Sequence, residues 1–341
     1  MPASSNVSAA GAEGAEQCII NDQMGPFIVL YILIFIAGLP GSLMSLWAFT
    51  CSPTDKQQSS RIYLVNLLAA DLLLLFALPF KILSDLGGPW SLRVFHCQAS
   101  AVTIYISLYA SIAFLAFIIT DRYMQDCQSL RSLRLHEVGF ARLLSVVVWL
   151  LLLLIMVPNM ALPTKQVQVQ QYLKCASLKQ DIGLHWHALA VFLCTALFLN
   201  ASAAVLISSS LALKRLLRSR SDPKLWSDAR RAAASVTAVA AAYVLSFVPY
   251  HVVRTPYTLA QTKVINDCST VKQLFLAKEA TLLLSVLHVC FDPLLFFCLC
   301  SPFRRTVRKM TSCCRRQVDG DEEQQEDTGQ PTTSALQEAA V

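Results

Sequence analysis

Charged residues are scarce in this chain of 341 residues. Asp, Glu, Lys and Arg make up 15% of it, whereas about a quarter of a soluble globular domain is charged. Hydrophobic residues make up 55%. Because so few charges cannot cover an ordinary soluble domain of this length, the composition favours a protein whose surface lies largely in lipid.

Three further features are missing, and each argues against a class of protein or site. Many transporters are built from two related halves. No internal repeat relates the two halves of this chain, which argues against a transporter. No grouping of residues typical of a catalytic site is visible, so we predict that the chain is not an enzyme. His185 and His187 stand two apart on a predicted helix and would not face each other, so they predict no metal site.

The first 23 residues contain neither a basic region nor an apolar stretch. A secretory signal peptide has both, so none is predicted, and the first apolar run is expected to begin insertion. Asn6-Val7-Ser8 matches the acceptor for N-glycosylation. Residues 1–25 are therefore predicted to form a glycosylated segment outside the cell.

Seven apolar runs follow, and each is close to the roughly 20 residues that a helix needs to cross a bilayer. They are Pro26–Thr50, Ile62–Leu83, Cys97–Thr120, Ala141–Leu162, Leu184–Leu213, Ala229–Tyr257 and Leu274–Cys300. We predict an all-α integral membrane protein with a seven-transmembrane helix bundle over residues 26–301. Residues 302–341 are predicted to form a short amphipathic eighth helix in the cytoplasm, followed by a disordered polar tail.

Lysine and arginine are unevenly distributed between the predicted loops. With the N-terminus outside, 19 of the 28 fall in the inner loops and tail, as the positive-inside rule requires. The net charge of +6 therefore reflects orientation in the plasma membrane and predicts no nucleic-acid partner. The basic runs Arg215–Arg220 and Arg304–Arg316 favour contact with membrane lipids, or with a cytosolic partner. Cys313 and Cys314 lie within the second run, which favours thioester lipidation.

Four of the twelve cysteines are predicted on the outer side, where disulfides persist. Cys18, Cys97, Cys175 and Cys268 allow three pairings. We pair Cys97, at the start of the third apolar run, with Cys175 in the second outer loop. This choice leaves Cys18 with Cys268.

Two acids lie inside predicted membrane helices, where an unpaired carboxylate is costly. Asp71 lies in the second run and Asp292 in the seventh. With Ser111 nearby on the third run, they are predicted to share a sodium ion or a proton as a switch. The alternative is that both carboxylates bind waters around the kink at Pro293.

Basic and aromatic residues are expected to meet near the outer ends of the helices. Lys81, Arg254 and Lys278 lie at one level on three predicted helices, and neighbouring side chains complete a cup. These neighbours are Tyr105, Tyr109 and His251. Such a cup suits an anionic ligand. The alternative is that Glu279 neutralises Arg254 or Lys278 and that the ligand binds elsewhere.

Asp121-Arg122-Tyr123 stands at the inner end of the third predicted helix, 24 residues after Cys97. An acid beside an arginine at the membrane edge can pair with it and hold it. Once released, the guanidinium offers five donors to the backbone carbonyls of a partner. The tripeptide at this position therefore predicts a contact with a cytosolic protein.

Together these residues resemble the rhodopsin-like family of G-protein-coupled receptors. The shared motifs are Leu67-Leu68-Ala69-Ala70-Asp71, Trp90 in the first outer loop, the Cys97 and Cys175 pair, Asp121-Arg122-Tyr123, Trp149, Pro249 and Asp292-Pro293. The resemblance extends from Cys18 to about Cys314. Within the family, Phe247-Val248-Pro249-Tyr250-His251-Val252-Val253-Arg254 and Lys278-Glu279-Ala280-Thr281 are similar to the P2Y purinoceptor-like branch.

This resemblance implies roles for individual residues. In that branch the counterparts of Arg254 and Lys278 contact ligand phosphates, and counterparts of four other residues line the same cavity. Those four are Tyr105, Asn159, Lys174 and Tyr257. Arg122 is implied to enter the interface with a G protein, usually of the inhibitory class. Ser208 and Phe296 stand where the family usually has tyrosine, which implies weaker or differently balanced signalling.

We therefore predict a receptor that binds a nucleotide-like, acidic lipid or acidic peptide ligand outside the cell and activates a heterotrimeric G protein inside. Hydroxyl residues in the acidic tail predict phosphorylation and recruitment of an arrestin-type partner. Two alternatives remain. A transporter would be revealed by ion flux, and a receptor-like protein that binds or dimerises would show little G-protein coupling.

Overall fold

The computed structural model describes residues 24–51, 59–126, 137–165, 175–261, 265, 267–300 and 303–309. Several predicted sites lie outside the described residues, namely Asn6, Cys18, Lys174, Cys313 and Cys314. The described residues are almost entirely helical, apart from an isolated antiparallel bridge between Thr164 and Lys179.

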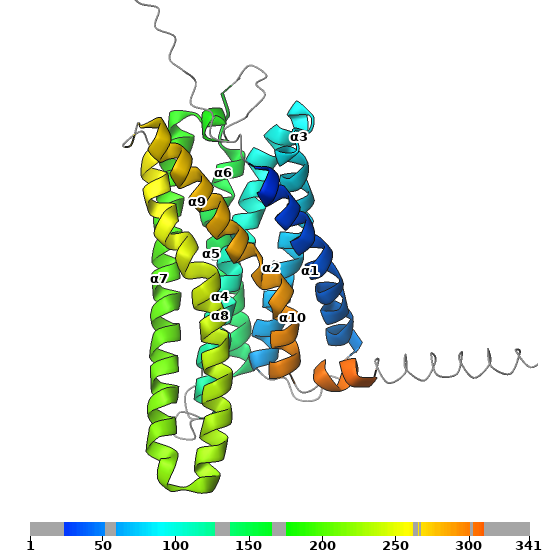
Figure 1. Ribbon diagram of the computed structural model, residues 1–341, viewed down its shortest axis with the longest axis vertical. Helices are drawn as coiled ribbons and strands as arrows, with labels where there is room; N and C mark the ends of the chain where they lie inside the picture. Colours follow the sequence, from blue (N-terminus) through cyan, green and yellow to red (C-terminus); the bar gives the residue numbers. More distant parts are fainter. Residues whose placement is uncertain are drawn as a thin grey trace, which may run out of the picture.

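Within these ranges, seven helical segments are long and apolar enough to cross a membrane. They are Gly25–Cys51, Ser59–Asp85, Trp90–Gln125, Val138–Ala161, Asp181–Ser221, Ala229–Gln261 and Cys268–Leu299. Each overlaps one of the predicted runs, so the seven-helix bundle is confirmed. Figure 1 shows these segments side by side.

Several spans consist of more than one helical element. The elements are α1 (Gly25–Cys51), α2 (Ser59–Asp85), α3 (Trp90–Phe95), the π-helical η1 (His96–Ser100), α4 (Ala101–Asp126), α5 (Val138–Met156), α6 (Pro158–Ala161), the 3-10 helix η4 (Cys175–Leu178), α7 (Asp181–Arg218), the 3-10 helix η5 (Ser219–Ser221), α8 (Pro223–Gln261), α9 (Cys268–Val286) and α10 (His288–Leu299). Trp90 therefore begins a helix that continues into the third span, whereas the sequence predicted a loop there. Hydropathy identifies only the apolar part of a helix and misses such polar extensions.

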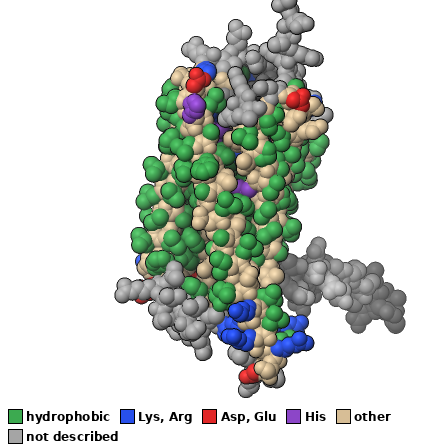
Figure 2. All heavy atoms as spheres, turned by 90° about the vertical axis from the view of Figure 1, so that its left-hand side faces the viewer, with side chains coloured by type: hydrophobic (Ala, Val, Ile, Leu, Met, Phe, Trp, Pro, Cys, Tyr) green, Lys and Arg blue, Asp and Glu red, His purple; other side chains and the backbone are tan. Residues whose placement is uncertain are grey.

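The third span runs through the middle of the bundle. Its element α4 packs against α2, α5, α7 and α8, and Leu108, Ile112 and Phe114 on it are fully buried. Other helices turn apolar side chains outward, as Leu154 and Phe192 do at 70% and 71% exposure. Figure 2 shows this hydrophobic cover along the length of the bundle. An apolar exterior is the arrangement expected of helices that face lipid.

The hairpin of α7 and α8 extends beyond the other helices at one end of the bundle (Figure 1). The short η5 joins the two helices, and Arg218, Arg220, Arg230 and Arg231 are exposed around the turn. Figure 2 shows lysine and arginine gathered at this end. The predicted basic surface near Arg215–Arg220 thus lies on a projecting helical hairpin.

A short helix over residues 303–309 follows the seventh span, as predicted. Phe303 is fully buried, and its ring centroid lies 5.3 Å from that of Phe49 and 6.2 Å from that of Phe296. Burial of one aromatic ring against α1 and α10 therefore holds this helix across the end of the bundle.

Candidate functional site

A cavity of about 730 Å³ opens at the end of the bundle that carries Cys97 and Cys175, here called the cavity end. Its wall includes seven of the predicted ligand residues, which are Lys81, Tyr105, Tyr109, Asn159, Arg254, Tyr257 and Lys278. They come from α2, α4, α6, α8 and α9, helices far apart in the sequence. The structure thus brings together the side chains that the sequence placed at one level.

His251 lies behind the cavity wall. Its ring stacks on Phe198, with centroids 3.7 Å apart and planes within 2°, and its Nδ1 lies 2.8 Å from the backbone oxygen of Phe247. The ring of Tyr109, which does line the cavity, is 5.5 Å away. The imidazole of His251 is directed toward α7 and away from the opening of the cavity. His251 therefore packs behind Tyr109 and does not line the cavity itself.

The disulfide between Cys97 and Cys175 is formed, with the two Cα atoms 5.1 Å apart. It ties η4 to η1, and both cysteines line the cavity. This confirms the first predicted bridge. Cys268 is also disulfide-bonded, while its predicted partner, Cys18, lies outside the described residues.

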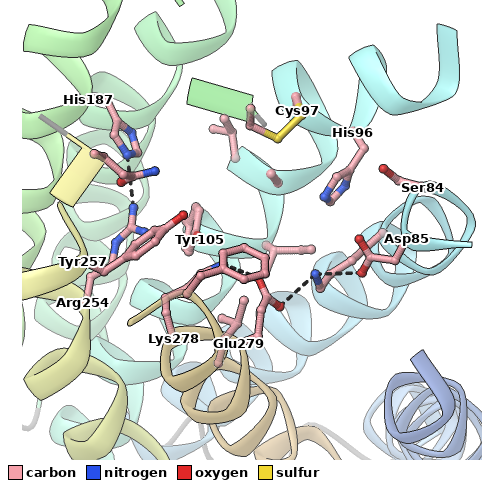
Figure 3. Close-up of a pocket in the computed structure, with 18 of the residues that line it drawn as sticks. Ser84, Asp85, His96, Cys97, Tyr105, His187, Arg254, Tyr257, Lys278 and Glu279 are labelled. Carbon is pink, nitrogen blue, oxygen red and sulfur yellow. Dashed lines mark hydrogen bonds and ion pairs between the residues drawn. A yellow bond between two sulfur atoms is a disulfide. The ribbon is translucent and has the colours of Figure 1, made fainter. Parts of the chain in front are cut away.

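Arg254 dominates one side of the cavity (Figure 3). Arg254 is 4% exposed, and its guanidinium donates to Nε2 of His187 on α7 over 3.2 Å. It also lies over the rings of Tyr105 and Tyr257, with its Cζ atom 5.2 and 5.9 Å from their centroids. Among the described residues, Arg254 makes no ion pair with a carboxylate. Its positive charge therefore faces the cavity without an acid to neutralise it.

Lys179 lies on the same side and was not predicted. Its Nζ donates to Oδ1 of Asn159 over 2.8 Å, and both residues line the cavity. Burial, with a smaller contribution from the charge of Arg254, lowers the pKa of Lys179 to about 8. The amine remains largely protonated at neutral pH, and a bound anion would favour that form.

Glu279 organises the opposite side of the cavity (Figure 3). Its carboxylate lies 3.1 Å from Nζ of Lys81 and also contacts Nζ of Lys278. Lys81 makes a second ion pair with Asp85 at 3.0 Å, and Tyr31 donates to Glu279 over 3.4 Å. Two lysines and two acids thus form a nearly balanced cluster between α2 and α9. Of the two cations that the sequence offered as partners of Glu279, Lys278 contacts it, whereas Arg254 forms no ion pair with it among the described residues.

At the other end of the bundle, Asp121-Arg122-Tyr123 lies in the last turns of α4. The Asp121 carboxylate accepts hydrogen bonds from Ser59 at 2.8 Å and from Ser60, both at the start of α2. Arg122 donates to the backbone oxygen of Leu299, the last residue of α10. The motif therefore joins the second, third and seventh spans at this end, here called the Arg122 end.

Midway between the two ends, Asp71, Ser111 and Asp292 lie together, as predicted from the sequence. His288 joins them, which the sequence did not predict. Its Nε2 lies 3.1 Å from Oγ of Ser111, 3.4 Å from Oδ1 of Asp71 and 3.9 Å from Oδ2 of Asp292. All four side chains are buried. His288 stands one helical turn before Asp292 on the polar face of the last span, and that spacing could have suggested its contact with Asp292 but not the one with Asp71 on α2.

Comparisons with known proteins agree with this architecture. The family described as "7 transmembrane receptor (rhodopsin family)" matches residues 41–296. G-protein coupled receptor 171 of Homo sapiens is 47% identical over 291 residues, which cover 85% of this chain and 91% of that protein. P2Y purinoceptor 14 of Bos taurus is 37% identical over 87% of this chain and 89% of its own. P2Y purinoceptor 13 of Rattus norvegicus is 36% identical over 96% and 99%, respectively.

Proposed function

Because the chain belongs to the rhodopsin family of seven-transmembrane receptors, we propose that it binds an anionic ligand in the cavity and passes this signal to a G protein at the Arg122 end. It is a G-protein-coupled receptor of the P2Y-like branch and not an enzyme. The ligand class, the class of G protein and the side of the membrane that each end faces belong to the proposal.

One observation carries the choice of ligand, namely the buried guanidinium of Arg254 without a carboxylate partner among the described residues. A buried cation that has no opposite charge is costly, and an anionic ligand would supply that charge. The planar guanidinium can hold a carboxylate or a phosphate through two parallel hydrogen bonds. Lys179 adds a second donor on the same side.

Purine nucleotides are the first ligands to test. The printed names of two relatives describe purinoceptors, and a nucleotide combines a flat aromatic ring with an anion. Tyr105 and Tyr257 offer aromatic faces beside Arg254, so one ligand could stack and form an ion pair at once. Acidic lipids and acidic peptides share the anion and complete the panel.

The proposed mechanism is a shift between two packings of the helices. Arg254 lies on α8, five residues beyond Pro249, and its present partner His187 lies on α7. An anion that takes hold of Arg254 would change the contact between α7 and α8 at the cavity end. Movement of α8 about Pro249 would then open the Arg122 end to a G protein.

The distribution of charge supports a proposed orientation, and the family supports proposed cytosolic partners. We place the N-terminus and the cavity outside the plasma membrane, with the basic hairpin of α7 and α8 in the cytoplasm. The G protein is proposed to be of the inhibitory class. The acidic, hydroxyl-rich tail is proposed to recruit an arrestin-type partner after phosphorylation.

The test is a screen of purine nucleotides, acidic lipids and acidic peptides on cells, with G-protein activation as the readout. For an active ligand, Arg254→Ala should weaken potency by roughly 10- to 100-fold, because a charge-assisted hydrogen bond contributes about 1.5–3 kcal/mol. Surface expression should stay normal. Lys165→Ala is the matched control, since Lys165 is exposed and pairs with Asp181 away from the cavity wall.

An agonist whose potency is unchanged in both Arg254→Ala and Lys179→Ala, at normal expression, would overturn the anionic-ligand proposal. A second candidate function is a receptor-like protein that binds or dimerises with little G-protein coupling. Ser208 and Phe296 support it, because both lack the hydroxyphenyl group usual at these positions. Nucleotide exchange on a purified G protein, with and without ligand, separates the two functions.

A further inference from the structure

The middle of the bundle holds a cluster of buried side chains with the composition of a metal site. Asp71 comes from α2, and His288 and Asp292 come from α10. One oxygen or nitrogen of each lies within 4.8 Å of those of the other two. Both oxygens of Asp71 and Oδ2 of Asp292 have no hydrogen-bond donor within bonding geometry among the described residues, although the two residues are at most 3% exposed. Carboxylate oxygens buried in this way indicate that a further group, such as a cation, completes the site.

The orientation of His288 determines which kind of cation fits. Its Nδ1 lies in hydrogen-bond contact with the backbone oxygen of Ser285, and a carbonyl only accepts, so Nδ1 carries a hydrogen. In an uncharged imidazole the lone pair is then on Nε2, the atom that faces the two carboxylates. A metal-binding histidine usually has this arrangement, in which one ring nitrogen binds the metal and the other donates to a carbonyl.

The distances between these atoms suit a small ion. Nε2 of His288 lies 3.4 Å from Oδ1 of Asp71 and 3.9 Å from Oδ2 of Asp292. In a tetrahedral zinc site with bonds of about 2.0–2.2 Å, neighbouring ligand atoms are roughly 3.3–3.6 Å apart. Only small side-chain movements would bring all three atoms onto one ion. A water or Ser111 Oγ, which is 3.1 Å from Nε2, could provide the fourth ligand.

A sodium ion, as predicted from the sequence, fits this arrangement less well. Sodium is a hard cation that favours oxygen ligands, and here an imidazole nitrogen stands among Asp71, Ser111 and Asp292. Imidazole with carboxylates favours zinc and similar transition metals. Two carboxylates would also neutralise the charge of a divalent ion, which matters because the site is buried.

We propose that Asp71, His288 and Asp292 bind a divalent transition-metal ion, with Zn²⁺ as the best fit, and that His288 makes the site select this ion over sodium. The ion would join α2 to α10 in the middle of the bundle. It would therefore stabilise the packing of these helices in which the three ligands converge. The inference concerns this cluster alone and does not depend on which ligand the cavity binds.

The experiment uses the purified full-length receptor, freed of metal with a chelator and then given Zn²⁺, Na⁺ or choline at equal ionic strength. The melting temperature and the metal content of the protein are measured. Zn²⁺ at about 100 times its dissociation constant should raise the melting temperature by roughly 5 °C or more, with about one ion per chain. Sodium should act no differently from choline.

Variants locate the ion. His288→Asn keeps an amide oxygen in place of the imidazole, so it should lose the response to Zn²⁺ and gain one to sodium. Asp71→Asn should lose both responses. His185→Ala is the matched control, because His185 is exposed on α7, and it should respond to Zn²⁺ like the unaltered protein.

Three results would overturn the proposal. One is an unaltered receptor that sodium stabilises and Zn²⁺ does not. Another is a Zn²⁺ response that survives in both His288→Asn and Asp71→Asn, which would place the ion elsewhere. If those variants do not fold, X-ray absorption at the zinc edge of the loaded receptor decides. A zinc ion with one imidazole and otherwise oxygen ligands supports the proposed site. A zinc ion with several imidazole ligands or any sulfur ligand contradicts it.

Discussion

Glu279 on α9 lies 3.1 Å from Lys81 on α2, and the same carboxylate contacts Lys278. Because of these contacts, the acidic side chains lie beside the two lysines on one side of the cavity and not beside Arg254. The two lysines have acids beside them, whereas Arg254 on α8 has the neutral His187 as its hydrogen-bond partner. The positive potential available to a ligand is therefore concentrated at Arg254 and Lys179, although the sequence assigned equal roles to Arg254 and Lys278.

Removing the charge of Glu279 is expected to destabilise the receptor. Glu279→Gln leaves Lys278 without its described acid partner and Lys81 with Asp85 alone. Breaking a buried ion pair from one side typically costs about 3–5 kcal/mol. The melting temperature of the purified receptor should fall clearly, and Lys278→Met in the same protein should restore part of it. The control is Glu137→Gln, because Glu137 is exposed. Equal melting temperatures for Glu279→Gln and Glu137→Gln would contradict a stabilising ion-pair cluster.

An anionic agonist is expected to be more potent with arginine than with lysine at position 254. Arg254→Lys keeps the charge and loses the two parallel donors and the planar stacking on Tyr105 and Tyr257. Potency of an anionic agonist should therefore lie between those of the unaltered receptor and Arg254→Ala. Lys278→Ala should weaken potency less than Arg254→Ala, since Lys278 already contacts Glu279. Concentration-response curves for the three variants test this order, and a larger loss in Lys278→Ala would show that the anion sits on the α9 side.

Ligand affinity is expected to fall at alkaline pH because of Lys179. Its pKa in the free receptor is about 8, and a bound anion raises that pKa by favouring the charged amine. Its contribution to binding is thus complete below pH 8 and is lost as the pH rises through 8 toward the pKa of the complex. At pH 9 about one tenth of the amine remains protonated in the free receptor, which limits the loss to roughly tenfold.

Equilibrium binding of an anionic ligand at pH 7 and pH 9 measures this effect. A ligand phosphate is ionised above about pH 6 and does not contribute to the change. Lys179→Met should bind more weakly at pH 7 and show little pH dependence. Lys179→Arg should keep its affinity at pH 9. The same pH dependence in Lys179→Met would assign it to another group.

The Cys97–Cys175 bridge is expected to be required for a functional cavity. Cys97→Ser frees η4 from η1, and both elements carry residues of the cavity wall. Loss of a native disulfide from a small secreted domain costs about 2–5 kcal/mol, so we expect reduced surface expression and little ligand binding. Cys51→Ser is the control, because Cys51 is a free, exposed cysteine. Normal ligand binding by Cys97→Ser would show that the bridge does not shape the cavity.

The seven spans and many of the candidate site residues could be predicted from the sequence because each depends on local properties. A bilayer of fixed thickness selects apolar runs of fixed length, so the predicted run Ala229–Tyr257 agrees with the observed span Ala229–Gln261. Helical periodicity places a residue on one face of its own helix. Asp71 and Asp292 were therefore expected to point inward, and they do meet.

The tertiary structure alone decided which of the inward-facing groups touch. The rotation and depth of each helix depend on packing against its neighbours, and a long side chain can reach any of several partners. For this reason the sequence left open whether Glu279 would neutralise Arg254 or Lys278. It also gave no sign that His251 would turn behind the cavity wall or that Lys179 would enter it. The position of His288 between the acids of two helices likewise depends on how α2 and α10 pack, which no property of either segment alone determines.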